Sequence, residues 1–376
     1  AEAVRALAPH GVGFVGINPI HAGFPADPAA VSPYSPSHRR RLSVAHLTVP
    51  GDAGGHTGPL VDTAADLPLR LAALRAAFEA SDPNDPGFAE WCVTEGDELA
   101  LFALHQALSD RFGPYWPDWA APYRDVTSPE VAAFAREHPR DIAFHAWLQW
   151  QADLQVGAAA SAAREAGMAL GLYLDLAVGT DPAGAETWAE PEAFASGVSL
   201  GAPPDAFSPA GQAWGLAPLD PHQLVADRFG LFADTLRAQL RHAKLLRIDH
   251  ILGVERAFWV PRDGTPGGYV AMPREALLAV IRIEATRAGA TVIGEDLGNV
   301  PHGLRDALAA SGLLGCRVAM FEEEHGHPRP AENYPEAVVA SFGTHDLPTW
   351  LGWREGRDIS AREGLGIVSP EDSAAA

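Results

Sequence analysis

Three carboxylates in the second half of the chain each follow a short apolar run, and they are Asp249, Glu295 and Asp346. Arg247 lies two residues before the first of them. Short apolar runs of this kind are typical of buried parallel strands. Barrel active sites form where such strands end, so three carboxylates are expected to meet at one rim. Carboxylate chemistry at a barrel rim points to glycosyl transfer.

Cleavage of a glycosidic bond with retention needs one carboxylate as nucleophile and a second as acid and then base. Asp249 suits the first role, because Arg247 lies on the same side of the strand and a guanidinium favours a charged carboxylate. Glu295 suits the second role, which needs a raised pKa, and neighbours such as Asp249 and Asp296 would raise it. Asp346 could bind ring hydroxyls and the cationic transition state. The alternative is that all three are strand-end caps or salt-bridge partners.

Six apolar runs are the elements that must position these side chains. They lie at about 12–17, 168–174, 244–248, 290–294, 316–321 and 337–342. Helical patterns lie between several of them, at 144–165, 223–243, 273–289 and 301–312. Alternating strands and helices predict an α/β fold with a parallel sheet, and a barrel is one way to close it.

Composition limits the possible partners. The formal charge of −21 argues against nucleic acid and anionic membrane surfaces, whereas a neutral sugar is unaffected by it. The basic run His38–Arg41 is therefore expected to form local salt bridges rather than a nucleic-acid patch. Cys92 and Cys316 are the only cysteines of the sequence, which favours a reducing, cytoplasmic location. No run approaches ~18 apolar residues, no signal-peptide pattern is visible, and no close-spaced histidine motif predicts a metal site.

Several motifs resemble those of one known family. They are Gly16–Ala22, Ser32–Ser37, Tyr173–Gly179, Gly201–Asp205, Gly211–Gly215, Arg247–His250, Gly294–Gly298 and Thr344–Asp346. Together they resemble glycoside hydrolase family 77, the 4-α-glucanotransferases, also called amylomaltases or disproportionating enzymes. The resemblance covers nearly the whole chain.

The resemblance implies a (β/α)8 TIM-type barrel with helical insertions, acting on maltooligosaccharides and α-glucans without a metal or organic cofactor. It assigns Asp249 as nucleophile, Glu295 as acid/base and Asp346 as the carboxylate that stabilises the transition state. Arg247 matches the arginine that hydrogen-bonds the nucleophile, and His345 matches a histidine at the donor sugar. The remaining matches are substrate contacts, namely Tyr34, Asp175, Trp214 and His250.

The resemblance also suggests how the chain is organised. Residues 1–43 would begin the barrel and carry an acceptor-side loop, 44–140 would form an inserted, mostly helical subdomain, and 141–376 would complete the catalytic barrel with a long substrate loop at 180–221. The six strand signals match family strands two to seven, so the chain is expected to be a fragment of an eight-stranded barrel.

Four functions stay open on the residues alone. The first is a retaining 4-α-glucanotransferase, and the second is a retaining α-glucan hydrolase, which differs only in accepting water. The third is a metal-dependent barrel enzyme such as a sugar isomerase. The fourth is a glucan-binding protein without turnover. The sequence indicates no oligomeric state.

Overall fold

The structure is a computed structural model that describes residues 1–49, 61–204, 208 and 210–368. The chain divides into two compact units, Ala1–Val292 and Ile293–Ala376, which are described separately below. Among the described residues no helix is both long and apolar enough to cross a membrane.

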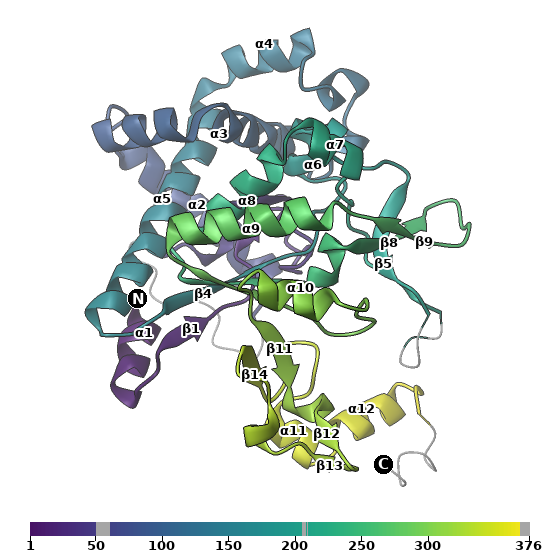
Figure 1. Cartoon of the computed structure of the whole chain (residues 1–376). Coiled ribbons are helices and arrows are strands. Elements are labelled where there is room, and N and C mark those ends of the chain that lie inside the picture. The colour runs from purple at the N-terminus through teal and green to yellow at the C-terminus, as the bar shows by residue number, and fades with distance from the viewer. Residues whose placement is uncertain (50–60, 205–207, 209, 369–376) are drawn as a thin grey trace. The chain divides into compact units, whose positions relative to one another are not determined.

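The six predicted strands are all present. They are β1 (Phe14–Gly16), β4 (Gly171–Leu176), β7 (Leu245–Ile248), β10 (Thr291–Gly294), β11 (Gly315–Val318) and β14 (Val338–Ser341). The first four form one sheet in the order β1-β4-β7-β10. Strand β11 pairs with β14 in parallel (Figure 1). A parallel bridge between Ile293 and Leu314 links the end of β10 to the start of β11. Within the four-stranded sheet the order of the strands follows chain order, as expected for successive strand–helix units.

Helices α5 (Pro139–Glu165) and α8 (Gly230–Leu240) pack against β4 and β7 of this sheet. The first unit also contains α1 (Glu2–Leu7), α7 (Pro221–Ala226) and α9 (Arg274–Ala288). Helices α8 and α9 lie side by side (Figure 1). Local sequence sets their ends, since Asp220 caps α7 by accepting from the backbone N–H of His222 at 2.7 Å. Helix α9 stops at Gly289, whose φ of 57° is left-handed. In the second unit, the fourth predicted helix is α10 (Leu304–Ala310).

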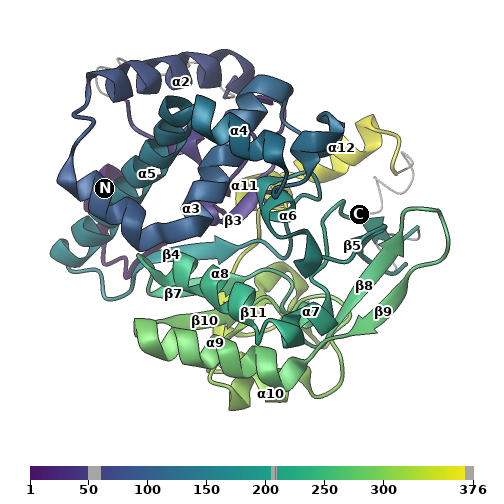
Figure 2. The ribbon, with the colours of Figure 1, turned by 90° about the horizontal axis from the view of Figure 1, so that it is seen from above.

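The stretch predicted as an inserted helical subdomain carries three long or medium helices. These are α2 (Thr63–Ala80), α3 (Pro86–Phe112) and α4 (Pro129–Glu137), and all three contact α5 (Figure 2). Leu74, Phe78, Phe144 and Trp147 are buried together where α2 meets α5. Such apolar burial stabilises the contact by roughly 1.5–3 kcal/mol for each large side chain. The boundaries of this subdomain remain a prediction.

The stretch at 180–221, predicted as one long loop, contains regular structure. Helix α6 (Ala185–Ala189) lies in it, together with β5 (Val198–Ala202) and β6 (Gln212–Ala213). These two strands join β8 (Arg256–Pro261) and β9 (Gly268–Ala271) in an antiparallel sheet of order β6-β5-β8-β9. Gly201 lies so close to β6 that a Cβ there would stand 2.0 Å from the Gln212 carbonyl oxygen. Glycine is thus required for strand pairing here, although glycine in a sequence indicates a loop.

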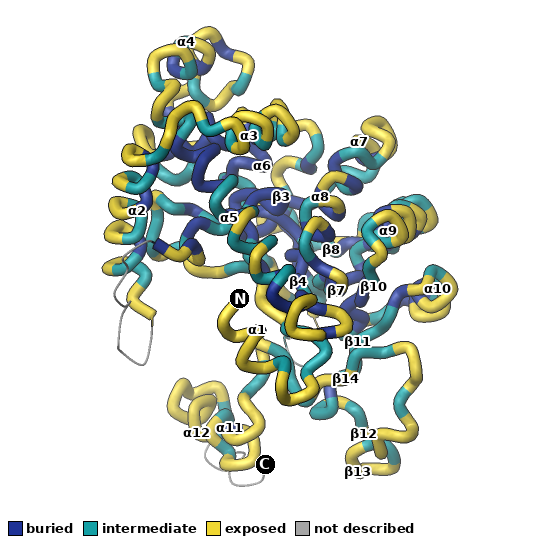
Figure 3. Tube along the Cα trace, turned by 90° about the vertical axis from the view of Figure 1, so that its left-hand side faces the viewer, coloured by how far each residue is buried: buried dark blue, intermediate teal, exposed yellow. Residues whose placement is uncertain are grey.

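A second element that the sequence did not reveal is β3 (His38–Leu42), which pairs antiparallel with β2 (His21–Ala22). Its residues His38 to Arg41 are buried, as the dark blue of β3 in Figure 3 shows. The three arginines form salt bridges with carboxylates of α3, α6 and the residue after α6, namely Glu95, Glu98, Glu186 and Glu190. The prediction that this basic run makes local salt bridges is confirmed. Its burial was not predicted, because all the partners are distant in sequence.

Candidate active site

The candidate residues of the first unit lie where β4 and β7 end. In the register of this parallel pair Asp175 is opposite Arg247. The backbone N–H of Asp249 donates to the carbonyl oxygen of Leu176 at 3.0 Å, which carries the pairing one step beyond β7. Alternation along the strand then places the side chains of Arg247 and Asp249 on one face, as the sequence predicted.

These side chains form one continuous hydrogen-bonded chain. The Tyr34 hydroxyl donates to Asp175 Oδ2 at 2.7 Å. Arg247 Nη1 donates to both carboxylate oxygens of Asp175 at 2.8 Å, and its Nη2 lies 2.8 Å from Asp249 Oδ1. One guanidinium therefore holds two carboxylates. The predicted contact between Arg247 and Asp249 is confirmed, and Tyr34 joins them from the segment between β2 and β3.

Burial dominates the electrostatics of this chain of contacts. It raises the pKa of Asp175, and the attraction of Arg247 only partly offsets that rise. Burial also raises the pKa of Tyr34, with a further rise from the charge of Asp175, so the phenol keeps its proton and acts as a donor. The site thus places more carboxylate than cation in a shielded region, which leaves acceptors for hydroxyl groups of a ligand.

Trp214 and His250 form a second contact beside Asp249. Their rings meet edge to face with centroids 5.0 Å apart. His250 holds a left-handed backbone with φ of 47°, an uncommon conformation for a side chain of this size. Burial lowers its pKa more than the charge of Asp249 raises it, so the ring is neutral at pH 7. Both residues and Asp249 line a cavity of about 90 Å³.

Arg39 lines the same cavity, and sequence analysis did not place it there. Its guanidinium binds Glu186 Oε1 at 2.8 Å, and its backbone N–H also donates to that carboxylate. Three consecutive arginines gave no signal for which one reaches the site. Asp205, the last residue of one family-like motif, lies outside the described residues.

In the second unit Glu295 directly follows β10 and is 9% exposed. The backbone N–H of Leu297 donates to its Oε1 at 2.9 Å. Asp249 and Asp296 were expected to raise the pKa of Glu295 by repulsion, and this stays a prediction. In the structure Asp296 Oδ2 lies 2.7 Å from Arg305 Nε and 3.0 Å from Arg317 Nη1. Burial raises the pKa of Asp296, but the hydrogen bond from the Cys316 backbone N–H, together with those from Arg305 and Arg317, outweighs burial and holds that pKa below its usual range.

His345 and Asp346 follow β14 in the same unit. Their side chains approach each other, with His345 Nε2 at 3.2 Å from Asp346 Oδ2. The side chain of Asp346 is 77% exposed, in contrast to that of Glu295. The Asp346 N–H donates to Thr344 Oγ1 at 3.3 Å, which stabilises the turn that presents the carboxylate.

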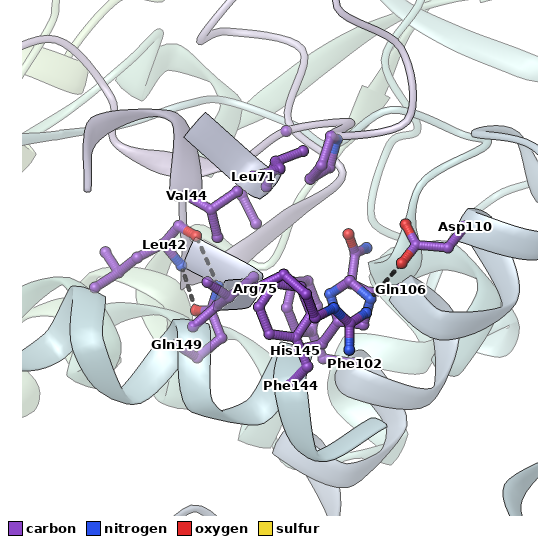
Figure 4. A pocket seen from close by; sticks show the side chains of 14 residues that line it. Leu42, Val44, Leu71, Arg75, Phe102, Gln106, Asp110, Phe144, His145 and Gln149 are labelled. Atoms are coloured by element: carbon purple, nitrogen blue, oxygen red, sulfur yellow. Dashed lines mark hydrogen bonds and ion pairs between the residues drawn. The ribbon is translucent and has the colours of Figure 1, made fainter. Parts of the chain in front are cut away.

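Another cavity, of about 210 Å³, lies between α2, α3 and α5 (Figure 4). Its polar side chains already have partners. His145 Nε2 lies 2.9 Å from Asp110 Oδ2, and Gln149 exchanges two hydrogen bonds of 2.8 Å with the Leu42 backbone. None of the candidate residues lines this cavity. Within the described residues no three His, Cys, Asp or Glu side chains gather to hold a metal ion.

Comparison with known proteins gives consistent results. A family model described as 4-alpha-glucanotransferase matches residues 1–372. The 4-alpha-glucanotransferase of Mycobacterium tuberculosis is 36% identical over 403 residues, covering 98% of this chain and 56% of the relative. The protein of the same name from Haemophilus influenzae is 32% identical, covering 99% of this chain and 59% of the relative. The chain thus spans little more than half the length of these curated relatives.

Solved structures agree on the fold. The amylomaltase of Corynebacterium glutamicum superposes with a TM-score of 0.86 at 31% identity, covering 99% of this chain and 55% of that one. A Streptococcus agalactiae amylomaltase in complex with acarbose superposes with a TM-score of 0.84 at 20% identity, covering 98% of this chain and 80% of that one. The predicted α/β barrel-type fold is confirmed by this similarity.

Proposed function

Because the chain belongs to glycoside hydrolase family 77, the 4-alpha-glucanotransferase family, we propose that it transfers α-1,4-glucan segments between maltooligosaccharides with retention. One observation carries the proposal. Asp249 stands at the end of a buried parallel strand with its carboxylate 2.8 Å from Arg247, which keeps it oriented and charged for attack. Relatives named 4-alpha-glucanotransferase support the reaction type.

In the first step the Asp249 carboxylate attacks the anomeric carbon of the donor, and the glycosidic bond breaks. Glu295 gives its proton to the leaving oxygen, which departs as the 4-hydroxyl of the shortened glucan. Asp346 faces the positive charge that develops on the sugar ring, and His345 binds a hydroxyl of that ring. A retaining pathway requires the carboxyl groups of Asp249 and Glu295 to stand roughly 5–5.5 Å apart.

In the second step a 4-hydroxyl of an acceptor glucan attacks the anomeric carbon and releases Asp249. Glu295, now a carboxylate, takes the hydroxyl proton and returns to its acid form. Tyr34 and Asp175 would bind sugar hydroxyls on one side of the nucleophile, and Trp214 with His250 would pack against a ring on the other. Water can replace the acceptor, so hydrolysis is the competing outcome.

Product analysis on maltotriose tests this proposal. Transfer predicts oligomers longer than maltotriose together with glucose. Glucose and maltose alone would show a hydrolase, and binding without any product would show a glucan-binding protein. Loss of turnover on treatment with a chelator would instead favour a metal-dependent enzyme.

A further inference from the structure

Asp296 is a buried carboxylate of the second unit with several hydrogen-bond partners. Only 1% of the residue is exposed. Its Oδ1 accepts the backbone N–H of Cys316 at 2.7 Å, so the end of β10 is tied to β11. Arg305 and Arg317 bind Oδ2 from two other directions. A buried carboxylate with this many charge-assisted hydrogen bonds is fixed in one orientation.

Arg305 holds the main chain as well as the side chain of Asp296. Its Nε donates to the carboxylate at 2.7 Å and its Nη2 donates to the Asp296 carbonyl oxygen at 3.0 Å. The two contacts immobilise the peptide group between Asp296 and Leu297, because the guanidinium is planar and rigid. The direction of the Leu297 N–H, which belongs to this peptide group, is fixed in the same way.

That N–H binds Glu295. It donates to Glu295 Oε1 at 2.9 Å, so the orientation of the carboxylate depends on the peptide that Asp296 and Arg305 hold.

We propose that Asp296 is a positioning residue, which fixes the Leu297 N–H through Arg305 and so orients the Glu295 carboxyl group towards the glycosidic oxygen. The inference rests on the proposed role of Glu295 as acid/base. Asp296 itself touches no reacting atom and supplies no proton. Its effect is confined to steps in which Glu295 moves a proton, because only those depend on where the Glu295 carboxyl group lies.

Rates measured with two substrates distinguish a role in positioning Glu295 from a general contribution to the stability of the fold. Cleavage of maltotriose needs a proton on the leaving oxygen, whereas α-maltosyl fluoride releases fluoride without one. We expect Asp296→Asn to lower first-turnover cleavage of maltotriose about 10²-fold, as misplacement by about 1 Å does. First-turnover fluoride release should fall less than about 3-fold, since it needs no positioned acid.

Glu284→Gln is the matched control. Glu284 lies on helix α9, outside the proposed catalytic set, and its side chain is 3% exposed. It is bound by Arg237 of α8 and by Arg287 of α9. It should change both rates by the same factor. Arg305→Gln replaces Asp296→Asn as the test if the latter fails to fold, because the Arg305 side chain is 53% exposed. It should also lower maltotriose cleavage more than fluoride release, but by a smaller factor.

The outcomes are distinct. If Asp296→Asn lowers the first-turnover rates on both substrates by the same factor, the positioning role is overturned. If that variant does not fold, equal factors in Arg305→Gln overturn it. The proposed function would stand in that case. If the wild-type chain turns over neither substrate, the proposed function itself fails.

Discussion

Two buried arginine–carboxylate contacts of the first unit behave in opposite ways. At β3, burial alone would raise the pKa of Glu186, but Arg39, His38 and Arg40 outweigh it and hold that pKa well below its usual range. At the strand ends, burial raises the pKa of Asp175 in spite of Arg247. Arg247 binds Asp249 as well as Asp175. Glu186, in contrast, accepts hydrogen bonds from the backbone N–H, Nε and Nη2 of Arg39.

The difference separates a structural ion pair from a functional one. Glu186 accepts three hydrogen bonds from Arg39, so breaking this pair would leave an uncompensated buried charge. The raised pKa of Asp175 means that its charge is under-compensated, which costs stability and is useful only where a ligand supplies donors. Substitutions at these residues test the contrast.

The largest effect is expected from Asp249→Asn. Transfer on maltotriose should fall by at least about 10⁴-fold, because the carboxamide cannot form the glycosyl-enzyme. The free energy of unfolding should be unchanged or rise by up to about 1 kcal/mol, since Arg247 is then left with one carboxylate. Product chromatography and urea unfolding measure the two effects. A marked loss of stability would argue that Asp249 is a structural partner.

Glu186→Gln should do the reverse. Breaking this buried pair leaves Arg39 without its counter-charge and should lower the free energy of unfolding by about 3–5 kcal/mol. Transfer per folded molecule should fall far less than in Asp249→Asn, although Arg39 lines the cavity. Urea titration followed by circular dichroism reports the stability, and a loss below about 1 kcal/mol would remove the contrast.

Acid should lower the free energy of unfolding through His21, a buried residue of β2, as pH falls from about 6.5 to 4. Burial, reinforced by the charge of Arg39, lowers the pKa of His21 from 6.5 to about 4. Between these values the unfolded chain takes up a proton that the folded chain does not, so stability is full above pH 6.5 and falls as pH drops towards 4. The contribution is about 3 kcal/mol at 1.36 kcal/mol for each pKa unit.

His21→Gln is the variant that isolates this contribution. Its carboxamide oxygen can replace Nε2 as acceptor for the Ala177 N–H, which His21 accepts at 3.1 Å. The variant should show a shallower dependence of stability on pH between about 6.5 and 4. An unchanged slope would show that other buried histidines, such as His105, account for the acid sensitivity.

The smallest effect is expected from Asp175→Asn. The free energy of unfolding should change by less than about 1 kcal/mol, because the raised pKa shows that the charge gains little from folding. Transfer should fall about 10–100-fold through loss of a sugar contact and of the hold on Arg247. A loss of stability equal to that of Glu186→Gln would show that the two contacts are of one kind.

Features that depend on local sequence patterns were predictable. All six parallel strands were predictable from apolar runs, and the Arg247–Asp249 contact followed from the period of two along a strand. Both features depend on neighbours within a few residues. They need no knowledge of which distant segments meet.

Features that depend on distant partners were missed. The burial of Arg39 could not be predicted, because its partner Glu186 lies 147 residues away. The β6-β5-β8-β9 sheet was not predicted, because Gly201 in a sequence is typical of a loop. In the structure the same residue permits close strand pairing. The contacts of Asp296 with Arg305 and Arg317 were not predicted either.

Trapping the covalent intermediate tests the central claim most directly. In Glu295→Gln, α-maltosyl fluoride can still glycosylate the nucleophile, but the base that activates the acceptor is missing, so the glycosyl-enzyme should accumulate. Tryptic digestion and tandem mass spectrometry should then find one maltosyl group on the peptide Ile248–Arg256, attached to Asp249. Fluoride release without an adduct, or an adduct on Glu255 or Asp346, would contradict the assignment of Asp249 as nucleophile.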